Sequence, residues 1–342
     1  MTAGSSRAFR EVPLVDISGL DTNLTTLDRA AVDQMGRAAS EVGFLYVTGH
    51  GIPPALIRDL ERAAQAFFAL PEEIKLRYYI GRSSNHRGYV PPGEEVFYGK
   101  TRDTKEAFDL SRDLPPGDYG AASRFLGPNV WPDELPGFRE AVTAYYEAAF
   151  ALGRRLLRGF VRALGLPADR LDGFVQRPPS QLRLVHYPPA SELENTMGIG
   201  AHTDYECFTI LHATSPGLQV MNSEGRWVDA PPIDGAFVIN IGDLFQVLSN
   251  GVYVSTSHRV LPTIRERFSF PFFFNLDYET VVAPLPELSK DGSLHGPLVA
   301  GAHLLAQTMQ SFRYMQRLSE RGELTLPAGS HALSSFGRER TS

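Results

Sequence analysis

The sequence predicts an α+β protein whose core is mainly β, a distorted double-stranded β-helix (jelly roll) with flanking N-terminal and C-terminal helices. Short apolar runs separated by turn residues follow one another from about residue 180 to 285, which is typical of an antiparallel sandwich. Helical periodicities lie on both sides of this region, at 136–166 and 297–321. With 342 residues, of which 43% are hydrophobic and 21% charged, the chain is long enough to bury one large core.

These patterns indicate one domain and limit the possible partners. We expect a flexible N-terminus at 1–10, a single domain at 11–325 with its β core at about 180–285, and a flexible tail at 326–342. A formal net charge of −6, with no Lys/Arg block, argues against a nucleic-acid partner. One cysteine excludes an internal disulfide, and no apolar run is long enough to span a membrane. Since no signal peptide is visible, we expect a cytoplasmic protein, monomeric or weakly homo-oligomeric, without nucleic-acid or membrane partners.

The N-terminal half predicts two short strands among several helices. We expect strands at 12–17 and 43–47, and helices at 24–40, at 53–70, from Pro71 and at 136–166. The helix from Pro71 has proline in its first turn and acidic residues near the positive end of the helix dipole. The apolar stripe at 136–166 should pack across the sheet as a scaffold helix.

Residues 83–110 differ in composition from both flanking regions. They are rich in Gly, Pro, Tyr and charged residues, which predicts a loop. Loops held by a rigid scaffold often carry binding residues. We therefore expect this segment to cover a binding pocket.

The C-terminal half predicts the sandwich itself. We expect strands at 182–187, 202–204, 218–221, 227–228, 237–241, around His258 and at 267–275. In the last of these, Phe268, Phe270, Phe272 and Phe274 share one face, and Arg267, Ser269, Pro271 and Phe273 share the other. The final helix at 297–321 should pack outside the sheet.

Three residues of this half have the chemistry of a metal site. His202 and Asp204 are two residues apart on an extended segment, so their side chains point to the same side. His258 lies in a strand-like run after the turn Asn250-Gly251 and can fold back beside them. Two histidines and one carboxylate form a facial triad, which holds Fe(II) and leaves other positions open. Since His-Xaa-Asp is common, a hydrogen-bonded histidine without a metal stays the alternative.

Arg267 and Ser269 follow His258 and add a second recognition element. On one face of a strand, the guanidinium and the hydroxyl make a clamp for a carboxylate. A structural pairing of Arg267 with a buried acid stays open as the alternative.

Together these residues resemble the Fe(II)/2-oxoglutarate-dependent dioxygenases of the isopenicillin N synthase-like family. The resemblance also covers the motifs at 12–17, 43–47, 50–52, 127–132 and 182–189. It implies a catalytic domain at 11–325 with Fe(II) on His202, Asp204 and His258. It also implies 2-oxoglutarate as co-substrate, bound by Arg267, Ser269 and Tyr187. The implied reaction uses O2 to hydroxylate a small metabolite of secondary metabolism, releasing succinate and CO2.

The candidate substrate contacts are Arg183, Tyr89, Glu95, Phe208, Phe245 and Phe273. Arg183 alternates onto the same face as Tyr187 and can attract an anionic group, while Tyr89 and Glu95 belong to a segment similar to one in microbial members of the family. The three phenylalanines would line a water-excluding pocket, although a phenylalanine in a sandwich is core by default. A merely solvated Glu95 also stays open. Val185 stands where plant members often have Asn, which weakens the case for a plant-type substrate.

Three classes of function stay open at this point. The first is a 2-oxoglutarate-dependent hydroxylase or desaturase of a small metabolite. The second is an oxidase of the same family that uses no 2-oxoglutarate, or an ethylene-forming enzyme. The third is a non-catalytic jelly-roll binding protein.

Overall fold

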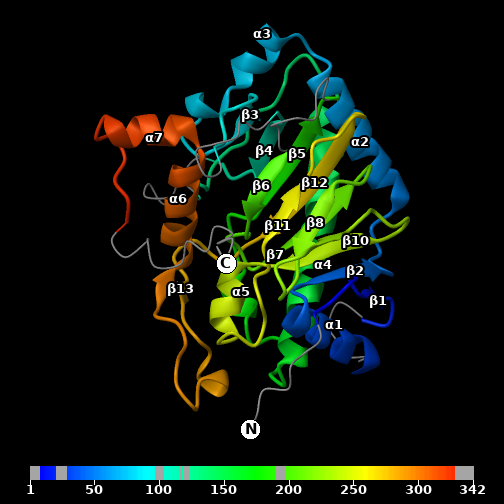
Figure 1. Cartoon of the computed structure of the whole chain (residues 1–342). Helices are drawn as coiled ribbons and strands as arrows, with labels where there is room; N and C mark the ends of the chain where they lie inside the picture. The colour runs from blue at the N-terminus through cyan, green and yellow to red at the C-terminus, as the bar shows by residue number, and fades with distance from the viewer. Residues whose placement is uncertain are drawn as a thin grey trace.

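Eight strands form the largest sheet, in the order β1-β2-β10-β7-β12-β5-β4-β3 (Figure 1). They are β1 (Leu14–Asp16), β2 (Phe44–Thr48), β3 (Gly88–Val90), β4 (Glu106–Ser111), β5 (Gln181–Tyr187), β7 (Phe208–Ala213), β10 (Phe237–Ile241) and β12 (Arg267–Phe274). All neighbours in this sheet are antiparallel except β1 and β2. The computed structural model describes residues 8–20, 29–96, 104–115, 118, 124–189 and 198–327, so most of the two expected flexible ends, at 1–10 and 326–342, lie outside the described residues.

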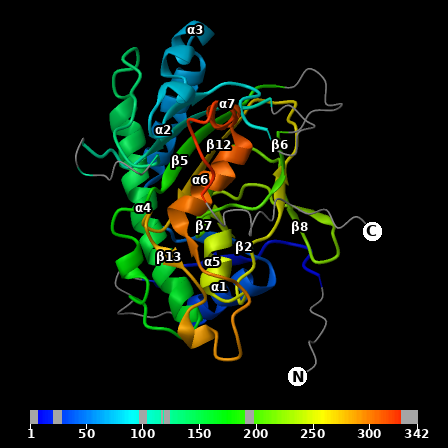
Figure 2. The ribbon, with the colours of Figure 1, turned by 90° about the vertical axis from the view of Figure 1, so that its left-hand side faces the viewer.

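A second sheet packs against the first and makes a sandwich. Its order is β6-β11-β8-β9, and its strands are β6 (Ile199–His202), β11 (His258–Val260), β8 (Leu218–Met221) and β9 (Trp227–Asp229). Figure 2 shows β6 and β8 on one side of the large sheet and α4 on the other. A small pair, β13 (Val281–Val282) with β14 (Leu298–Val299), lies before the C-terminal helices.

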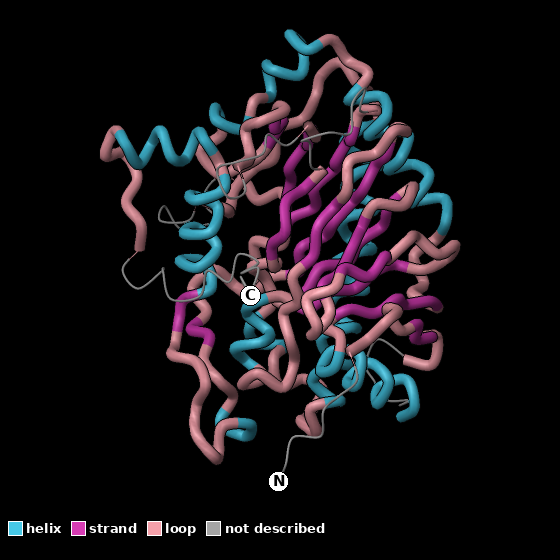
Figure 3. Tube along the Cα trace, viewed as in Figure 1, coloured by secondary structure: helices cyan, strands magenta, loops and turns pink. Residues whose placement is uncertain are grey.

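Helices cover the outer face of the large sheet and lie at its margins (Figure 3). They are α1 (Arg29–Glu41), α2 (Pro54–Phe68), α3 (Glu72–Lys75), α4 (Phe138–Ala163), α5 (Asp243–Leu248), α6 (Ala300–Ser311) and α7 (Arg313–Glu320), with 3₁₀ turns at Leu76–Tyr78, Ile80–Arg82, Asp172–Phe174 and Pro286–Leu288. The long helix α4 packs on α1, α2 and β12, as the apolar stripe predicts. Among the described residues, every helix is too short or too polar to cross a membrane.

The two faces of β12 meet different surroundings, the hydrophobic core on one side and a cavity on the other. Its four alternating phenylalanines, Phe268, Phe270, Phe272 and Phe274, are buried in the core under the helices. Its other face, with Arg267, Ser269, Pro271 and Phe273, lines a cavity between the two sheets. The predicted division of this strand into two faces is therefore confirmed.

Two expectations about elements are wrong. Residues 83–110 are not only a loop, because they contain β3 and β4, whose residues are all buried in the large sheet. The final helix is two helices that meet at Phe312, which is extended (φ −109°, ψ 123°). Instead of packing outside the sheet, α6 lines the cavity with Leu304, Thr308 and Ser311.

Candidate metal and co-substrate site

Three ligand atoms converge where β6 and β11 meet. His202 and His258 are paired directly across these strands, and their ring centres are 4.3 Å apart. The Nε2 atom of each histidine lies 3.6 Å from Oδ1 of Asp204. One nitrogen or oxygen atom from each of the three side chains lies within 4.8 Å of the others. The strands thus assemble the predicted triad from segments more than fifty residues apart.

Both histidines direct Nε2 toward the centre of this cluster. Nδ1 of His202 lies 2.8 Å from the carbonyl oxygen of Gly200, and Nδ1 of His258 lies 3.2 Å from that of Thr256. Since a carbonyl only accepts, each Nδ1 carries a hydrogen, so in the neutral form of each ring the lone pair is on Nε2. Burial, together with the neighbouring His258, lowers the pKa of His202. Two imidazoles and a carboxylate are the donor set that suits Fe(II).

The triad opens into the cavity between the sheets. This cavity is also lined by His86, Glu95, Lys105, Gln181, Arg183, Val185, Tyr187, Ile199, Tyr205, Glu206, Thr209, Leu211, Leu218, Asn240, Val260, Arg267, Ser269, Pro271, Phe273, Leu304, Thr308, Ser311 and Phe312. Two parts of this lining matter for charge: Arg267 stands by itself beside Tyr187, and a cluster of charged groups surrounds Arg183.

Arg267 is a buried cation without a carboxylate partner in the described part of the chain. It is 1% exposed, and its guanidinium carbon lies 4.6 Å from the ring centre of Tyr187, its partner across β12 and β5. Nε donates to the carbonyl oxygen of Ser215 at 3.1 Å, but Nη1 has no hydrogen-bond partner among the described residues. A buried guanidinium needs an anion, and the hydroxyl of Ser269 lies on the same face of β12. This end therefore fits a ligand carboxylate, and the alternative of a buried acid on Arg267 has no support in the described residues.

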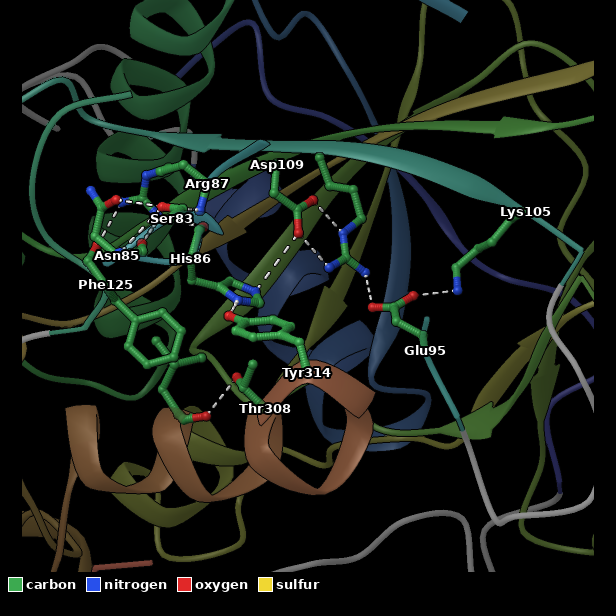
Figure 4. Close-up of polar contacts among 12 residues, drawn as sticks. Ser83, Asn85, His86, Arg87, Glu95, Lys105, Asp109, Phe125, Thr308 and Tyr314 are labelled. Carbon is green, nitrogen blue, oxygen red and sulfur yellow. Dashed lines mark hydrogen bonds and ion pairs between the residues drawn. The ribbon is translucent and has the colours of Figure 1, made fainter. Parts of the chain in front are cut away.

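The other end of the cavity holds a compact network of opposite charges. Arg183 donates from Nε and Nη2 to the two oxygens of Asp109, both at 2.7 Å, and from Nη1 to Glu95 at 2.5 Å. Lys105 pairs with the second oxygen of Glu95 (Figure 4). Burial opposes ionisation of Glu95, but the attraction of Arg183 and Lys105 outweighs it and lowers the pKa of the carboxyl to about 2.

An uncharged histidine completes this network. His86 is 2% exposed, with Nδ1 2.6 Å from the hydroxyl of Tyr314 and Nε2 3.7 Å from Asp109 (Figure 4). Burial and the nearby Arg183 lower the pKa of His86 well below its usual range. The ion pairs at this end join two cations, Arg183 and Lys105, to the carboxyl groups of Glu95 and Asp109, and the buried Arg87 also lies near Asp109.

Nine of the residues predicted for the site line this cavity. They are His202, Asp204, His258, Arg267, Ser269, Tyr187, Arg183, Glu95 and Phe273. Val185, between Arg183 and Tyr187 on β5, lines it as well. The period-two pattern of β5 and β12 brought the predicted residues of these two strands to one face, as expected.

Three predicted substrate contacts lie elsewhere, in the hydrophobic core. Tyr89 on β3 donates to Oε2 of Glu106 at 2.6 Å in a buried cluster. Phe208 stacks on Phe274 at 4.8 Å, on the core face of the large sheet. Phe245 on α5 packs edge-on against other buried aromatic rings. The expectation that Tyr89, Phe208 and Phe245 line the pocket is therefore wrong, because their side chains face the helices.

Sequence reasoning also missed several cavity residues. Gln181 alternates with Arg183 on β5, so the period-two pattern contains the signal for it. Lys105 and Phe312 come from segments distant from the triad, and only the folded chain brings them there. The ring of Phe312 lies 5.4 Å from the guanidinium carbon of Arg183, and 4.6 Å from the ring of His86.

Comparison with known proteins gives consistent matches over most of the chain. Residues 12–134 match the family described as non-haem dioxygenase in morphine synthesis N-terminal, and residues 178–276 match the 2OG-Fe(II) oxygenase superfamily. Homoarginine-6-hydroxylase 2-ODD-233 of Oryza sativa subsp. japonica is 34% identical over 323 residues, covering 89% of this chain and 98% of the relative. Homoarginine-6-hydroxylase 2-ODD-C23.1 of Arabidopsis thaliana is 37% identical over 293 residues, covering 81% and 88%.

Solved structures of the same fold are also similar. A full-length Neurospora crassa protein, solved in complex with alpha-KG, superposes with a TM-score of 0.75 at 27% identity, covering 86% of this chain and 95% of that one. A 2OG-Fe(II) oxygenase family protein from Caulobacter crescentus gives a TM-score of 0.75 at 30% identity, covering 92% and 100%. These similarities confirm the predicted jelly roll with flanking helices.

Proposed function

This chain belongs to the 2OG-Fe(II) oxygenase superfamily and is an Fe(II)- and 2-oxoglutarate-dependent dioxygenase. We propose that its substrate is a small zwitterionic metabolite, which it hydroxylates. The observation that carries the proposal is that groups of both signs, Arg183 and Lys105 with Glu95 and Asp109, lie together at the cavity end away from Arg267. A ligand that carries groups of both signs can pair with members of both signs in this set, which an uncharged ligand or one with charges of a single sign cannot do.

We propose the following roles for the residues of the triad and the clamp. His202, Asp204 and His258 hold Fe(II), while Arg267, Ser269 and Tyr187 hold the distal carboxylate of 2-oxoglutarate. Nη1 of Arg267 supports this role, because it has no hydrogen-bond partner among the described residues and a carboxylate would supply the acceptor. When bound, iron and 2-oxoglutarate supply the oxidising chemistry, in which 2-oxoglutarate and O2 give succinate, CO2 and one oxygen atom for the substrate.

The chain itself positions the substrate and excludes water. Val185, Leu304 and Phe273 give the cavity apolar walls, which keep bulk water and oxidisable polar groups away from the reacting C–H bond. Arg183 and Glu95 lie where they can pair with charged substrate groups, so that one C–H bond is held toward the triad.

The substrate class follows from charge and from the relatives. The two plant relatives are named for hydroxylation of homoarginine, an amino acid with an ammonium, a carboxylate and a guanidinium group. Such a molecule offers an anion to Arg183 and Lys105 and a cation to Glu95. L-Homoarginine and related basic amino acids are therefore the first substrates to test.

We also propose that residues 11–325 form a single catalytic domain. In support, β1 and β2 from the N-terminal part lie in the same sheet as β10 and β12. All the proposed ligands come from one chain, which suits a monomer or weak homo-oligomer. The acidic charge balance and the single, buried Cys207 suit a cytoplasmic location.

The experiment is a succinate assay with Fe(II), 2-oxoglutarate, O2 and a panel of amino acids that includes L-homoarginine. Succinate formation that depends on a zwitterionic amino acid, with a hydroxylated product, supports the proposal. Oxygen uptake without 2-oxoglutarate would indicate the oxidase alternative, and ethylene in the headspace the ethylene-forming one. Turnover of neutral or purely anionic compounds in preference to amino acids would overturn the proposed substrate class.

A further inference from the structure

The two carboxylate oxygens of Asp204 have different surroundings. Oδ2 accepts two hydrogen bonds, one from the hydroxyl of Thr209 and one from Nδ2 of Asn240 at 2.7 Å. Oδ1 faces the two histidines, 3.6 Å from each Nε2. Because Oδ2 is engaged on the protein side, the carboxylate has a fixed orientation before any metal binds.

The two donors are placed by the large sheet. Thr209 on β7 and Asn240 on β10 are direct partners across the two strands, and they are 3% and 2% exposed. Asn240 is the one polar residue of the otherwise apolar strand β10. A buried amide costs free energy unless it is hydrogen-bonded, so the sequence tolerates Asn240 because it has Asp204 as its acceptor.

The backbone of Asp204 is fixed as well. Its carbonyl oxygen accepts from the backbone nitrogen of Asp243 at 2.9 Å, at the start of α5. Asp204 lies just beyond the end of β6, where the strand pairing no longer holds it. The hydrogen bonds from the side chains of Thr209 and Asn240 therefore hold Asp204 in place where pairing within a strand does not.

We propose that Thr209 and Asn240 are positioning residues that make Asp204 a one-oxygen metal ligand. This inference rests on the proposed role of Asp204 as a ligand. Oδ1 of Asp204 and Nε2 of the two histidines would then be the three donor atoms that the chain offers, while Oδ2 would stay with its protein donors.

The test uses Co(II) as an air-stable probe of the full-length chain without 2-oxoglutarate. Thr209→Val removes the hydroxyl at equal volume, and Asn240→Leu removes the amide. We expect each variant to bind Co(II) about ten- to a hundredfold more weakly by calorimetric titration, with an altered visible absorption spectrum of the bound ion. Thr209→Ser, which keeps the hydroxyl, should restore the affinity.

A matched control is Thr308→Val. Its hydroxyl is equally buried and lines the same cavity, but it donates to the carbonyl oxygen of Leu304 within α6 at 2.8 Å. Its Co(II) affinity should equal that of the parent protein. The melting temperature of each metal-free variant shows whether the substitution acts on the fold instead.

The outcomes separate this inference from the proposed function. A parent protein that does not bind Co(II) would overturn the proposed metal site and the inference with it. A parent that binds, with Thr209→Val and Asn240→Leu within twofold of it, would overturn the inference alone, whatever their melting temperatures. If Asn240→Leu does not fold, the isosteric Thr209→Val decides.

Discussion

Glu94 and Glu95 are neighbours in the chain, yet their carboxylates serve different parts of the molecule. Glu94 accepts from the backbone nitrogen of Tyr314 at 2.6 Å, in the first turn of α7. Glu95 turns into the cavity and pairs with Arg183 and Lys105. The backbone at Glu95 forms an antiparallel bridge with Phe312. The backbone nitrogen of Val96 donates to the carbonyl oxygen of Ser311 at 2.8 Å, and that of Arg313 donates to the carbonyl oxygen of Glu94 at 3.0 Å.

Neutralising Glu95 should weaken substrate binding. Glu95→Gln removes the anion that the proposed substrate cation would meet, so the KM for L-homoarginine should rise about ten- to a hundredfold. The affinity for 2-oxoglutarate should stay unchanged, because Arg267 lies at the other end of the cavity. Steady-state succinate formation with each ligand varied in turn measures both.

Glu94→Gln is the matched control for that change. It removes a carboxylate from the N-terminus of α7, which should lower the free energy of unfolding by about 0.3–1 kcal/mol. The KM for the amino acid should not change. If Glu94→Gln and Glu95→Gln shifted KM equally, the cavity role of Glu95 would be refuted.

Replacing Arg267 should affect the co-substrate alone. Arg267→Lys keeps the charge but loses the planar pair of donors, so the affinity for 2-oxoglutarate should fall about ten- to a hundredfold while metal binding persists. Ser269→Ala should have a smaller effect, because it removes one neutral donor. Titration of the metal-loaded protein with 2-oxoglutarate measures the change, and Arg265→Lys, at an exposed position two residues away, is the control. A lower melting temperature with unchanged affinity would give Arg267 a purely structural role.

Metal binding should raise the melting temperature of the parent protein but not that of a variant that lacks one of the metal-ligating side chains. A ligand that binds only the folded state adds about 2.7 kcal/mol at a hundred times its Kd, so Co(II) should raise the melting temperature of the parent. His258→Ala should show no such rise and no succinate formation. His212→Ala is the control, because His212 contacts Glu61 at 2.7 Å, outside the cavity. Full turnover in His258→Ala would exclude it as a ligand.

Acid should remove the stabilisation that Glu95 provides. The pKa of Glu95 is about 2 in the folded protein, against an ordinary value of 4.5. As the pH falls below 4.5, the unfolded chain therefore takes up the proton first, and this contribution is lost as the pH approaches 2. Urea unfolding of the parent and Glu95→Gln should show a stability difference that is constant at neutral pH and shrinks below pH 4.5. A difference independent of pH would show that Glu95 is not ionised in the folded state.

Period-two alternation explains which parts of the site the sequence predicts well. It correctly assigns Arg267, Ser269 and Phe273 to the cavity face of β12, and Arg183 and Tyr187 to that of β5. It fails for Phe208, because a strand buried on both faces carries apolar residues on each, and the sequence does not tell which face meets the helices.

Residues supplied by distant elements are beyond a local pattern. Phe312 enters the cavity because α6 ends one residue before it, at Ser311. The carbonyl oxygen of Ser311 accepts a hydrogen bond from the backbone nitrogen of Val96, which lies more than two hundred residues earlier in the chain. Lys105 lies directly before β4, and β4 pairs with β5, the strand that carries Arg183. Such positions depend on tertiary pairing, which outweighs local propensity.

The order of the large sheet also bears on how the protein is made. The strand β2 lies between β1 and β10, so its second edge stays open until more than half of the chain has followed it from the ribosome. Pairing over such a separation is slow, and an unpaired apolar strand is prone to aggregate in the meantime. A nascent chain that stops before residue 237 cannot complete this sheet, whatever it has already folded. Synthesis at lower temperature, or with chaperones that shield β2, should therefore raise the yield of folded enzyme more than it raises the yield of total chain.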